Sequence, residues 1–357
     1  MILFPNLGNT CYCSSVLQCF IYNPDFIKII NTEDIINTEN TEILLLLKDI
    51  INNSNNSNNK EYSLLPLLKI IKKEKPWFKC FEQNDAHEFL LLFLDILQNT
   101  LQGTIKKSVN KEYSRKEFLK NNNKLLIKSY YGELMSVVRC NKCNKINKSY
   151  SEFNSINLNI PSEKREYSLQ ELFGLFLCEE SNINYNCEYC NDNNNNNNNN
   201  DNNNNNDNND NNDNNDNNNN NTKKESFNIL PNNLIIVLNR YSSNGLKNNN
   251  PVKISKTLLI KESKTGDIKE YFLTGIINHF GLLFGGHYNN IIIHNNNNYL
   301  VDDNSLHNIN NNINNNMNNN MNNNMNNNMN NNMNNNMNNN DLSSRNCYIL
   351  FYSINKE

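Results

Sequence analysis

The chain has 357 residues with 33 basic and 36 acidic side chains, which give a net charge of −3 at pH 7. This near balance gives no indication of a nucleic-acid or membrane partner, and no apolar stretch approaches the roughly 18 residues of a membrane-spanning helix. Ten cysteines, in a chain that we expect to be cytoplasmic or nuclear, indicate free thiols, catalysis or metal binding rather than a disulfide framework.

Three Asn-rich tracts interrupt the chain at residues 52–59, 191–221 and 308–340. The last has Met at every fourth position, a spacing also compatible with one face of a helix, but Asn is a poor helix former. Because such tracts bury no apolar surface, we expect disordered insertions at loop tips. The remainder, roughly 280 residues, is enough for one large domain or two small ones.

The first third of the chain is predicted to be helical. Apolar residues recur at helical spacing in four segments: residues 11–22, 41–51, 64–73 and 84–97. Asn9 or Thr10 can cap the first of these helices, which begins at Cys11. Asn84 can cap the last, and its first turn holds Asp85.

From about residue 130 the pattern changes to short strands. Strands are expected in these segments: residues 130–138, 149–158, 233–239, 271–279, 288–293, 299–302 and 347–352. Residues 169–177 have the pattern of a brief helix, and residues 233–239 are almost continuously apolar, as at the centre of a sheet. The fold class is therefore α+β, with a helical lobe, a cysteine-bearing β extension and a β-sheet lobe.

Cys11 is the first candidate for chemistry. It follows Gly8, Asn9 and Thr10 and starts an apolar helix, so the peptide dipoles favour a thiolate over a thiol. A thiolate is a strong nucleophile near neutral pH. The competing interpretation is a small buried apolar residue, which is the usual role of a cysteine.

His287 and a following carboxylate complete a possible catalytic set. Two glycines precede His287 at the start of a strand. If the chain reverses around Asn295, Tyr288 lies opposite Asp302, and the antiparallel pair brings His287 and Asp302 to the same sheet edge. A slip of one residue would present Asp303 instead.

Each residue of this set has a role in acyl transfer. His287 would accept the thiol proton and return it to the leaving amine, and Asp302 would orient the imidazole. The tetrahedral oxyanion needs hydrogen-bond donors, for which the backbone N–H of Cys11 and the side-chain amide of Asn6 are candidates.

Four further cysteines form two Cys-x-x-Cys pairs, Cys140 with Cys143 and Cys187 with Cys190. Two such pairs supply the four thiolates that a tetrahedral zinc ion prefers. The alternatives are a redox pair or a chance spacing. With no vacant ligand position, the zinc would be structural.

The sequence resembles the ubiquitin-specific proteases, which are papain-like cysteine deubiquitinases. Six segments carry the resemblance in order along the chain: residues 6–18, 83–90, 230–241, 271–288, 299–303 and 348–352. Together they span essentially the whole chain outside the Asn-rich tracts. Two departures from the family pattern are Ser14, where Asn is usual, and Asn298, where Trp is usual.

The resemblance implies a single catalytic domain of thumb, palm and fingers, in residues 1–129, 241–357 and 130–240, with one structural zinc at the fingertips. It implies ubiquitin and ubiquitinated proteins as partners of a monomer.

By the same resemblance, Cys11 would be the nucleophile, His287 the base and Asp302 the orienting residue, with Asp303 as the alternative. Asn6 would be the oxyanion donor. Four residues would line the channel for the ubiquitin tail: Gln83, Asp85, Glu88 and Tyr288. Residues 280–285 would form a gate over it.

The resemblance implies hydrolysis of the bond after the C-terminal glycine of ubiquitin, through an acyl-thioester at Cys11. Two other functions stay open: a ubiquitin-docking scaffold with an inactive triad, and a protease for a ubiquitin-like modifier.

Overall fold

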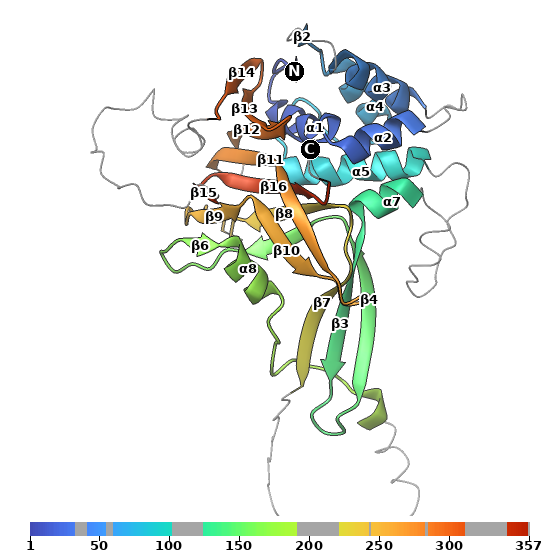
Figure 1. The fold of residues 1–357 in the computed structure, drawn as a ribbon, viewed down its shortest axis with the longest axis vertical. Coiled ribbons are helices and arrows are strands. Elements are labelled where there is room, and N and C mark those ends of the chain that lie inside the picture. Colours follow the sequence, from blue (N-terminus) through green and yellow to red (C-terminus); the bar gives the residue numbers. More distant parts are fainter. Residues whose placement is uncertain are drawn as a thin grey trace, which may run out of the picture.

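The computed structural model describes residues 1–32, 41–54, 60–101, 124–190, 221–242, 244–282, 285–310 and 341–355. Figure 1 shows three regions: a helical lobe, a large central sheet beneath it, and a stalk of three strands that extends away from the sheet. The predicted insertions at residues 191–221 and 308–340 lie almost wholly outside the described residues, as do residues 55–59 of the first tract.

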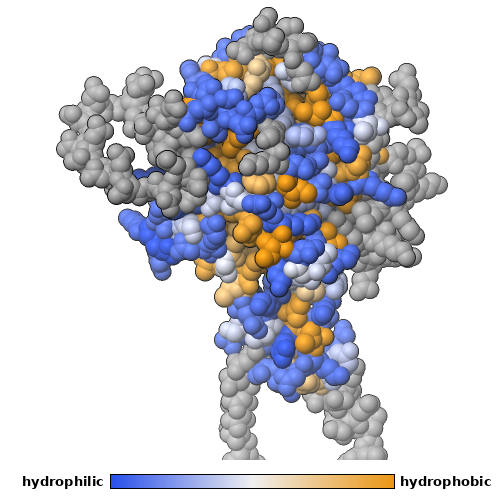
Figure 2. Space-filling model, in the orientation of Figure 1, coloured by the Kyte–Doolittle hydropathy of each residue, from blue (hydrophilic) through white to orange (hydrophobic). Residues whose placement is uncertain are grey.

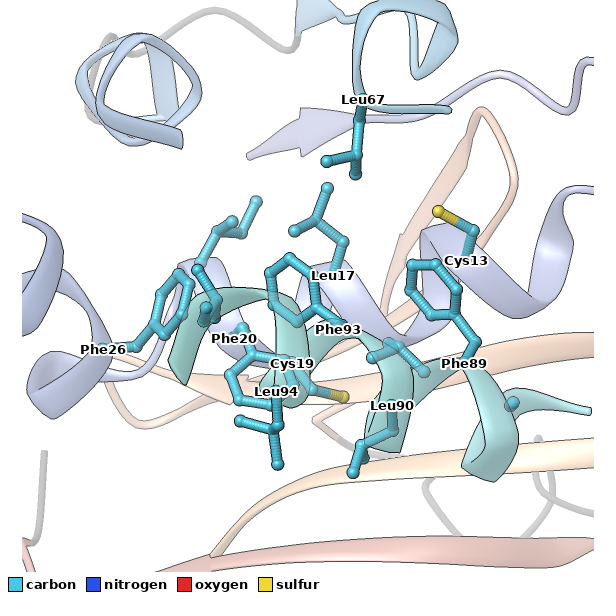
Figure 3. Packing of buried hydrophobic residues seen from close by; sticks show 14 of the residues in the cluster. Cys13, Leu17, Cys19, Phe20, Phe26, Leu67, Phe89, Leu90, Phe93 and Leu94 are labelled. Carbon is cyan, nitrogen blue, oxygen red and sulfur yellow. The ribbon is translucent and has the colours of Figure 1, made fainter. Parts of the chain in front are cut away.

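Six helices in the described part form the helical lobe: α1 (Cys11–Ile21), α2 (Pro24–Thr32), α3 (Glu42–Ser54), α4 (Leu65–Glu74), α5 (Ala86–Leu101) and α7 (Lys124–Tyr130). Their apolar faces meet in one core, in which α1 is buried along its whole length. Figure 3 shows the aromatic centre of this core, where the ring of Phe20 on α1 lies 5.4 Å from Phe93 on α5. α1 also contacts the central sheet, so it is held from both sides.

The central sheet has the strand order β14-β13-β12-β11-β16-β8-β5, and β10 also pairs with β11. Its strands are β5 (Ile156–Asn159), β8 (Asn233–Asn239), β10 (Thr257–Lys261), β11 (Ile268–Leu282), β12 (Gly285–His294), β13 (Asn297–Asp302), β14 (Ser305–Asn308) and β16 (Cys347–Ser353). The predicted central strand is confirmed in β8, which is flanked by β16 and β5 and is buried over its first six residues. Strands buried on both faces have this continuous apolar pattern.

The stalk consists of β3 (Gly132–Arg139), β4 (Ile146–Phe153) and β7 (Thr222–Ile229), in the order β4-β3-β7. Most of β4 is exposed, including Ile146 and Tyr150 at 47% and 43%. Figure 2 shows hydrophobic residues among the hydrophilic ones on this stalk.

Short elements complete the fold. β1 (Ile2–Leu3) pairs with β2 (Lys60–Glu61), and β6 (Tyr167–Ser168), β9 (Val252–Ser255) and β15 (Asp341–Ser344) form a small sheet. The predicted brief helix is α8 (Leu169–Phe176), which Ser168 and Glu171 cap reciprocally. Among the described helices, none has the length and apolar character needed to cross a membrane.

Several predicted boundaries are wrong. The predicted strand 149–158 is two strands, β4 and β5, which belong to different sheets. β5 and β8 fall within the predicted fingers segment but pair in the central sheet, where the first six residues of β8 and alternate residues of β5 are buried. The limits of thumb, fingers and palm stay a prediction.

The Asn-rich tracts are ordered at the ends that adjoin or continue a helix or strand. α3 continues through Asn52 to Ser54, and Asn221 is buried. At the other tract, Asn308 ends β14 and Ile309 is only 3% exposed. The expected disorder is therefore wrong at these ends, because pairing and burial continue into the tract.

Candidate active site and metal centre

Cys11 begins α1 as predicted, at the end of a tight loop. Gly8 and Asn9 have φ values of 95° and 55°, a left-handed region that Gly and Asn tolerate. Thr10 occupies the N-cap position without a side-chain cap bond; its hydroxyl instead accepts from the backbone N–H of Leu7 at 2.9 Å. The expected capping is therefore wrong, and the first N–H groups of α1 are left for other acceptors.

Asn6 closes the same loop. Its Oδ1 accepts from the backbone N–H groups of Gly8 and Thr10, both at 3.0 Å. Its Nδ2 donates to Asp303 Oδ2 at 3.1 Å. An amide nitrogen has two hydrogens, so the second can still face the region in front of Cys11.

His287 lies between Asp302 and Cys11. Its Nε2 is 2.5 Å from Asp302 Oδ1, which leaves Nδ1 for the thiol. The hydrogen bonds to Asp302 and to Cys11 raise the pKa of His287 to about 10, while burial acts in the opposite direction. Burial alone would raise the pKa of Asp302, but the hydrogen bond and charge of His287 bring it below its usual value. The arrangement therefore favours the imidazolium form of His287 beside the Asp302 carboxylate.

The predicted register of this hairpin is wrong by one residue. His294 pairs with Asn297, so the chain turns through two residues, Asn295 and Asn296, with φ values of 51° and 59°. Turns with two positive φ values match the twist of a hairpin, and Asn is favoured in them. Extending this register places Asp302 opposite Asn289 rather than Tyr288.

This correction explains why Asp302 reaches the imidazole. Directly opposed residues point to the same face of a sheet, and so do residues two apart along a strand. Asp302 opposite Asn289 therefore shares a face with His287. In the predicted register Asp302 would have pointed to the other face. Asp303 has a φ of 50° and bonds to Asn6 instead, and burial raises its pKa.

Gly286 allows two strands to meet closely beside the imidazole. A Cβ atom on Gly286 would lie 2.4 Å from His279 Nε2 and 2.3 Å from the carbonyl oxygen of Phe280. Such contacts are not sterically possible, so only glycine fits here. The glycine that precedes His287 is thus required by the approach of β11 and β12. The predicted gate, residues 280–285, includes residues 283 and 284, which lie outside the described residues.

A cavity of about 300 Å³ lies beside His287, since Gly286 and Tyr288 on either side of that residue line it. The four residues expected to line a tail channel all line this cavity: Gln83, Asp85, Glu88 and Tyr288. Four further residues complete its lining: Asn84, His279, Gly285 and Gly286. His279 was not predicted as a site residue. Its ring stacks on Tyr288 at 4.4 Å, and burial lowers its pKa to about 4. A histidine within the apolar residues of β11 was the sequence signal for it.

Asp85 has a structural role that the sequence assigned to Asn84. Its Oδ1 accepts from the backbone N–H groups of His87 and Glu88, at 2.8 and 3.1 Å, and thereby caps α5. Its Oδ2 accepts from the hydroxyls of Tyr348 and Tyr288, at 2.7 and 3.4 Å. Asp85 therefore links the helical lobe to β16 and β12 at the wall of the cavity.

Replacing Asp85 with alanine should lower the free energy of unfolding by about 2 kcal/mol, because α5 loses its cap and two phenols lose an acceptor. Urea unfolding measures this change. Glu88→Gln is the matched control, since Glu88 is exposed in the same helical turn and should change stability by less than about 0.5 kcal/mol. Equal effects of the two substitutions would contradict the linking role of Asp85.

The four cysteines of the two Cys-x-x-Cys pairs come together at the end of the stalk. Cys140 Sγ is 3.8 Å from Cys190 Sγ, and Cys143 Sγ is 3.6 Å from Cys187 Sγ. All four sulfur atoms lie within 4.8 Å of one another. Zinc–sulfur bonds of about 2.3 Å in a tetrahedron separate the sulfurs by roughly 3.8 Å. The four thiols therefore fit a zinc ion, and at these separations they are free rather than disulfide-bonded.

Asn221 supports this cluster. Its Oδ1 accepts from the backbone N–H of Asn141, inside the first Cys-x-x-Cys turn, at 3.0 Å. Its Nδ2 donates to the carbonyl of Ile183 at 3.5 Å and to that of Tyr185 at 3.4 Å, shortly before the second pair. One buried amide thus connects the two segments that carry the thiols, as is usual around metal sites.

Comparison with known proteins decides the family. The sequence profile of the ubiquitin carboxyl-terminal hydrolases matches residues 4–352. The chain belongs to this family. It is 22% identical over 314 residues to ubiquitin carboxyl-terminal hydrolase Usp2 of Drosophila melanogaster, covering 79% of this chain and 30% of the relative. It is 27% identical over 316 residues to human ubiquitin carboxyl-terminal hydrolase 26, covering 76% and 31%. The chain thus spans about a third of the length of these relatives.

Solved structures show the same fold. The chain is similar to a chain of the SAGA DUB module Ubp8/Sgf11/Sus1/Sgf73 bound to monoubiquitin, with a TM-score of 0.68 and 19% identity, over 100% of this chain and 69% of that chain. The predicted resemblance to the ubiquitin-specific proteases and the predicted papain-like α+β fold are therefore confirmed. The roles of the individual residues remain predictions.

Proposed function

We propose that this chain is a cysteine deubiquitinase that hydrolyses the peptide or isopeptide bond after the C-terminal glycine of ubiquitin. The observation that carries the proposal is the contact of His287 with both Asp302 and Cys11 beside the cavity under β11 and β12. Membership of the ubiquitin carboxyl-terminal hydrolase family supports the substrate class. A related structure is described as a DUB module bound to ubiquitin aldehyde, which supports recognition of the ubiquitin tail.

In the first half-reaction the Cys11 thiolate attacks the carbonyl carbon of the terminal glycine. The oxyanion receives hydrogen bonds from the backbone N–H of Cys11 and from the second Nδ2 hydrogen of Asn6. His287 then gives its Nδ1 proton to the leaving amine, and the C–N bond breaks. The product is an acyl-thioester at Cys11 and a free amine.

In the second half-reaction water replaces the amine. His287, now neutral, takes a proton from water, and the hydroxide attacks the thioester carbonyl. The C–S bond breaks, ubiquitin leaves with a free carboxylate, and the thiolate–imidazolium pair is restored. Asp302 keeps Nε2 protonated throughout, so that Nδ1 is always the nitrogen that exchanges the proton.

The ubiquitin tail would occupy the cavity of about 300 Å³, with Gln83, Glu88 and Tyr288 in its wall. Glu88 is exposed at the first turn of α5 and supplies a negative charge there. Asp85 would act indirectly, since its oxygens already accept hydrogen bonds from α5 and from two tyrosines.

Cys140, Cys143, Cys187 and Cys190 would hold one zinc ion, which would cross-link the end of the stalk. It would take no part in hydrolysis, because four thiolates leave no ligand position for water or substrate. The stalk would support ubiquitin through the exposed apolar residues of β4. We propose a monomer, acting on ubiquitinated proteins in the cytoplasm or nucleus.

The test is reaction with a ubiquitin derivative that carries an electrophile at its C-terminus, followed by mapping of the modified cysteine. We expect one adduct, on Cys11, and turnover of a fluorogenic ubiquitin C-terminal amide by the unmodified protein. Cys178→Ser is the control, because Cys178 is the exposed thiol. Labelling of another cysteine would overturn the proposal. Binding without turnover would indicate a scaffold, and preferential labelling by a ubiquitin-like tail would indicate a different modifier.

A further inference from the structure

A row of polar side chains crosses three adjacent strands behind the catalytic carboxylate. Asn278 on β11 pairs with Asn289 on β12, and the register of β12 with β13 places Asn289 opposite Asp302. Asn278 and Asn289 are 1% and 2% exposed. Burying amides is costly unless hydrogen bonds compensate, so this row calls for a physical reason.

The hydrogen bonds in this row have a direction. Asn278 Nδ2 donates to Asn289 Oδ1 at 3.1 Å, and Asn289 Nδ2 donates to Asp302 Oδ2 at 3.4 Å. If the Asn289 amide were reversed, its oxygen would face the carboxylate and its nitrogen would face the Asn278 donor. Both contacts would be repulsive, so the Asp302 carboxylate and the Asn278 donor together favour the orientation in which Nδ2 of Asn289 faces Asp302.

The row is not arranged for stability alone. Asn278 Oδ1 is buried without a hydrogen-bond partner, which is unfavourable for folding. On the side away from His287, the next pair on the same face of these strands is apolar, Ile276 with Ile291. An apolar pair at the positions of Asn278 and Asn289 would continue that core. Local departures of this kind are typical of functional sites.

We propose that Asn289, oriented by Asn278, is a positioning residue that holds the Asp302 carboxylate in line with the His287 imidazole. With Oδ2 held by Asn289, Oδ1 is directed at Nε2 of His287, which it meets at 2.5 Å. Asn289 does not touch the reacting atoms; it acts through Asp302. This inference rests on the proposed thiol chemistry at Cys11.

Other titratable groups also act on Asp302: His287 on β12, Asp303 just after β13, and His307 on β14. None of them hydrogen-bonds Oδ2 among the described contacts. Loss of Asn289 would therefore leave this oxygen without a donor among the residues that the structure describes. The carboxylate could then rotate, and the imidazolium would be stabilised less.

The test compares Asn289→Leu with Asn290→Leu. Asn290 is the next residue on β12 and is equally buried, at 2% exposed, but it points to the opposite face of the sheet, away from Asp302. With the fluorogenic ubiquitin amide, we expect Asn289→Leu to lower kcat by about tenfold with little change in KM. The alkaline limb of its pH profile should move to lower pH, whereas Asn290→Leu should change neither.

Asn278→Leu provides a second variant that leaves Asn289 in place. We expect a change in the same direction but smaller, because Asn289 loses only its orienting partner. Equal kinetics for Asn289→Leu and Asn290→Leu would overturn the inference. So would a rise in KM without a fall in kcat, since that would indicate altered binding.

A ubiquitin-free measurement separates this inference from the proposed function. The rate of Cys11 alkylation by iodoacetamide, followed by peptide mapping across pH, reports on the thiolate–imidazolium pair alone. An altered profile in Asn289→Leu, in a protein that does not turn over ubiquitin substrates, would refute the function and support the inference. Normal turnover of ubiquitin substrates, together with an unaltered pH profile of alkylation in Asn289→Leu, would support the function and refute the inference.

Discussion

Replacing Cys11 with alanine should lower kcat/KM for a fluorogenic ubiquitin C-terminal amide on the order of 10⁴-fold or more, to the background rate. Without the sulfur no acyl-thioester can form, and neither His287 nor Asp302 can substitute as a nucleophile. Ubiquitin binding should be retained, because the residues that line the cavity beside Cys11 are unchanged. Steady-state kinetics and a binding titration measure the two effects separately.

The matched control is Cys13→Ala in the same helix. Cys13 is fully buried two residues further along α1, and its replacement removes a thiol without touching His287. We expect nearly normal turnover from this variant. Turnover by Cys11→Ala within tenfold of the unmodified protein would rule out the covalent mechanism.

Purified protein should contain about one zinc ion per chain, and Cys187→Ser should remove it, because three thiolates and a hydroxyl bind zinc much more weakly than four thiolates. Structural zinc contributes about 10–16 kcal/mol of apparent binding free energy in small zinc-dependent folds. Its loss should therefore release the end of the stalk. Metal analysis and hydrogen exchange in β3, β4 and β7 measure this outcome.

Cys178→Ser is the control for the zinc experiment, since Cys178 lies outside the cluster and is exposed. It should keep its zinc. We expect Cys187→Ser to raise KM for ubiquitin substrates with a smaller effect on kcat, because the metal lies far along the stalk from the thiol. Full zinc content in Cys187→Ser would contradict the proposed ligand set.

Local features of the fold were predictable from the sequence. The start of α1 at Cys11 follows from Gly8 and Asn9, which tolerate the left-handed backbone of the preceding loop. The central position of β8 follows from its unbroken apolar run. Cys140 with Cys143, and Cys187 with Cys190, were identifiable as ligand pairs because each pair is a local turn.

Contacts between segments far apart in the sequence were harder to predict. α5 is capped by Asp85 rather than by Asn84, the predicted cap. The Asp85 carboxylate also bonds to tyrosines on β12 and β16. The role of His279 depends on its stacking against Tyr288 on the next strand. Neither contact has a signal in local spacing: the first depends on how the helical lobe sits on the sheet, and the second on the pairing of β11 with β12.

The sequence by itself determined the chemistry available to this protein: a thiol at a helix start, a histidine after two glycines, two adjacent carboxylates, and four paired cysteines. Only the tertiary structure shows that Asp302, rather than Asp303, contacts His287. The deciding feature is the two-residue turn at Asn295 and Asn296, which shifts the hairpin by one residue from the predicted register. Side chains alternate between faces along a strand, so this shift directs Asp302 to His287 and leaves Asp303 to bond Asn6.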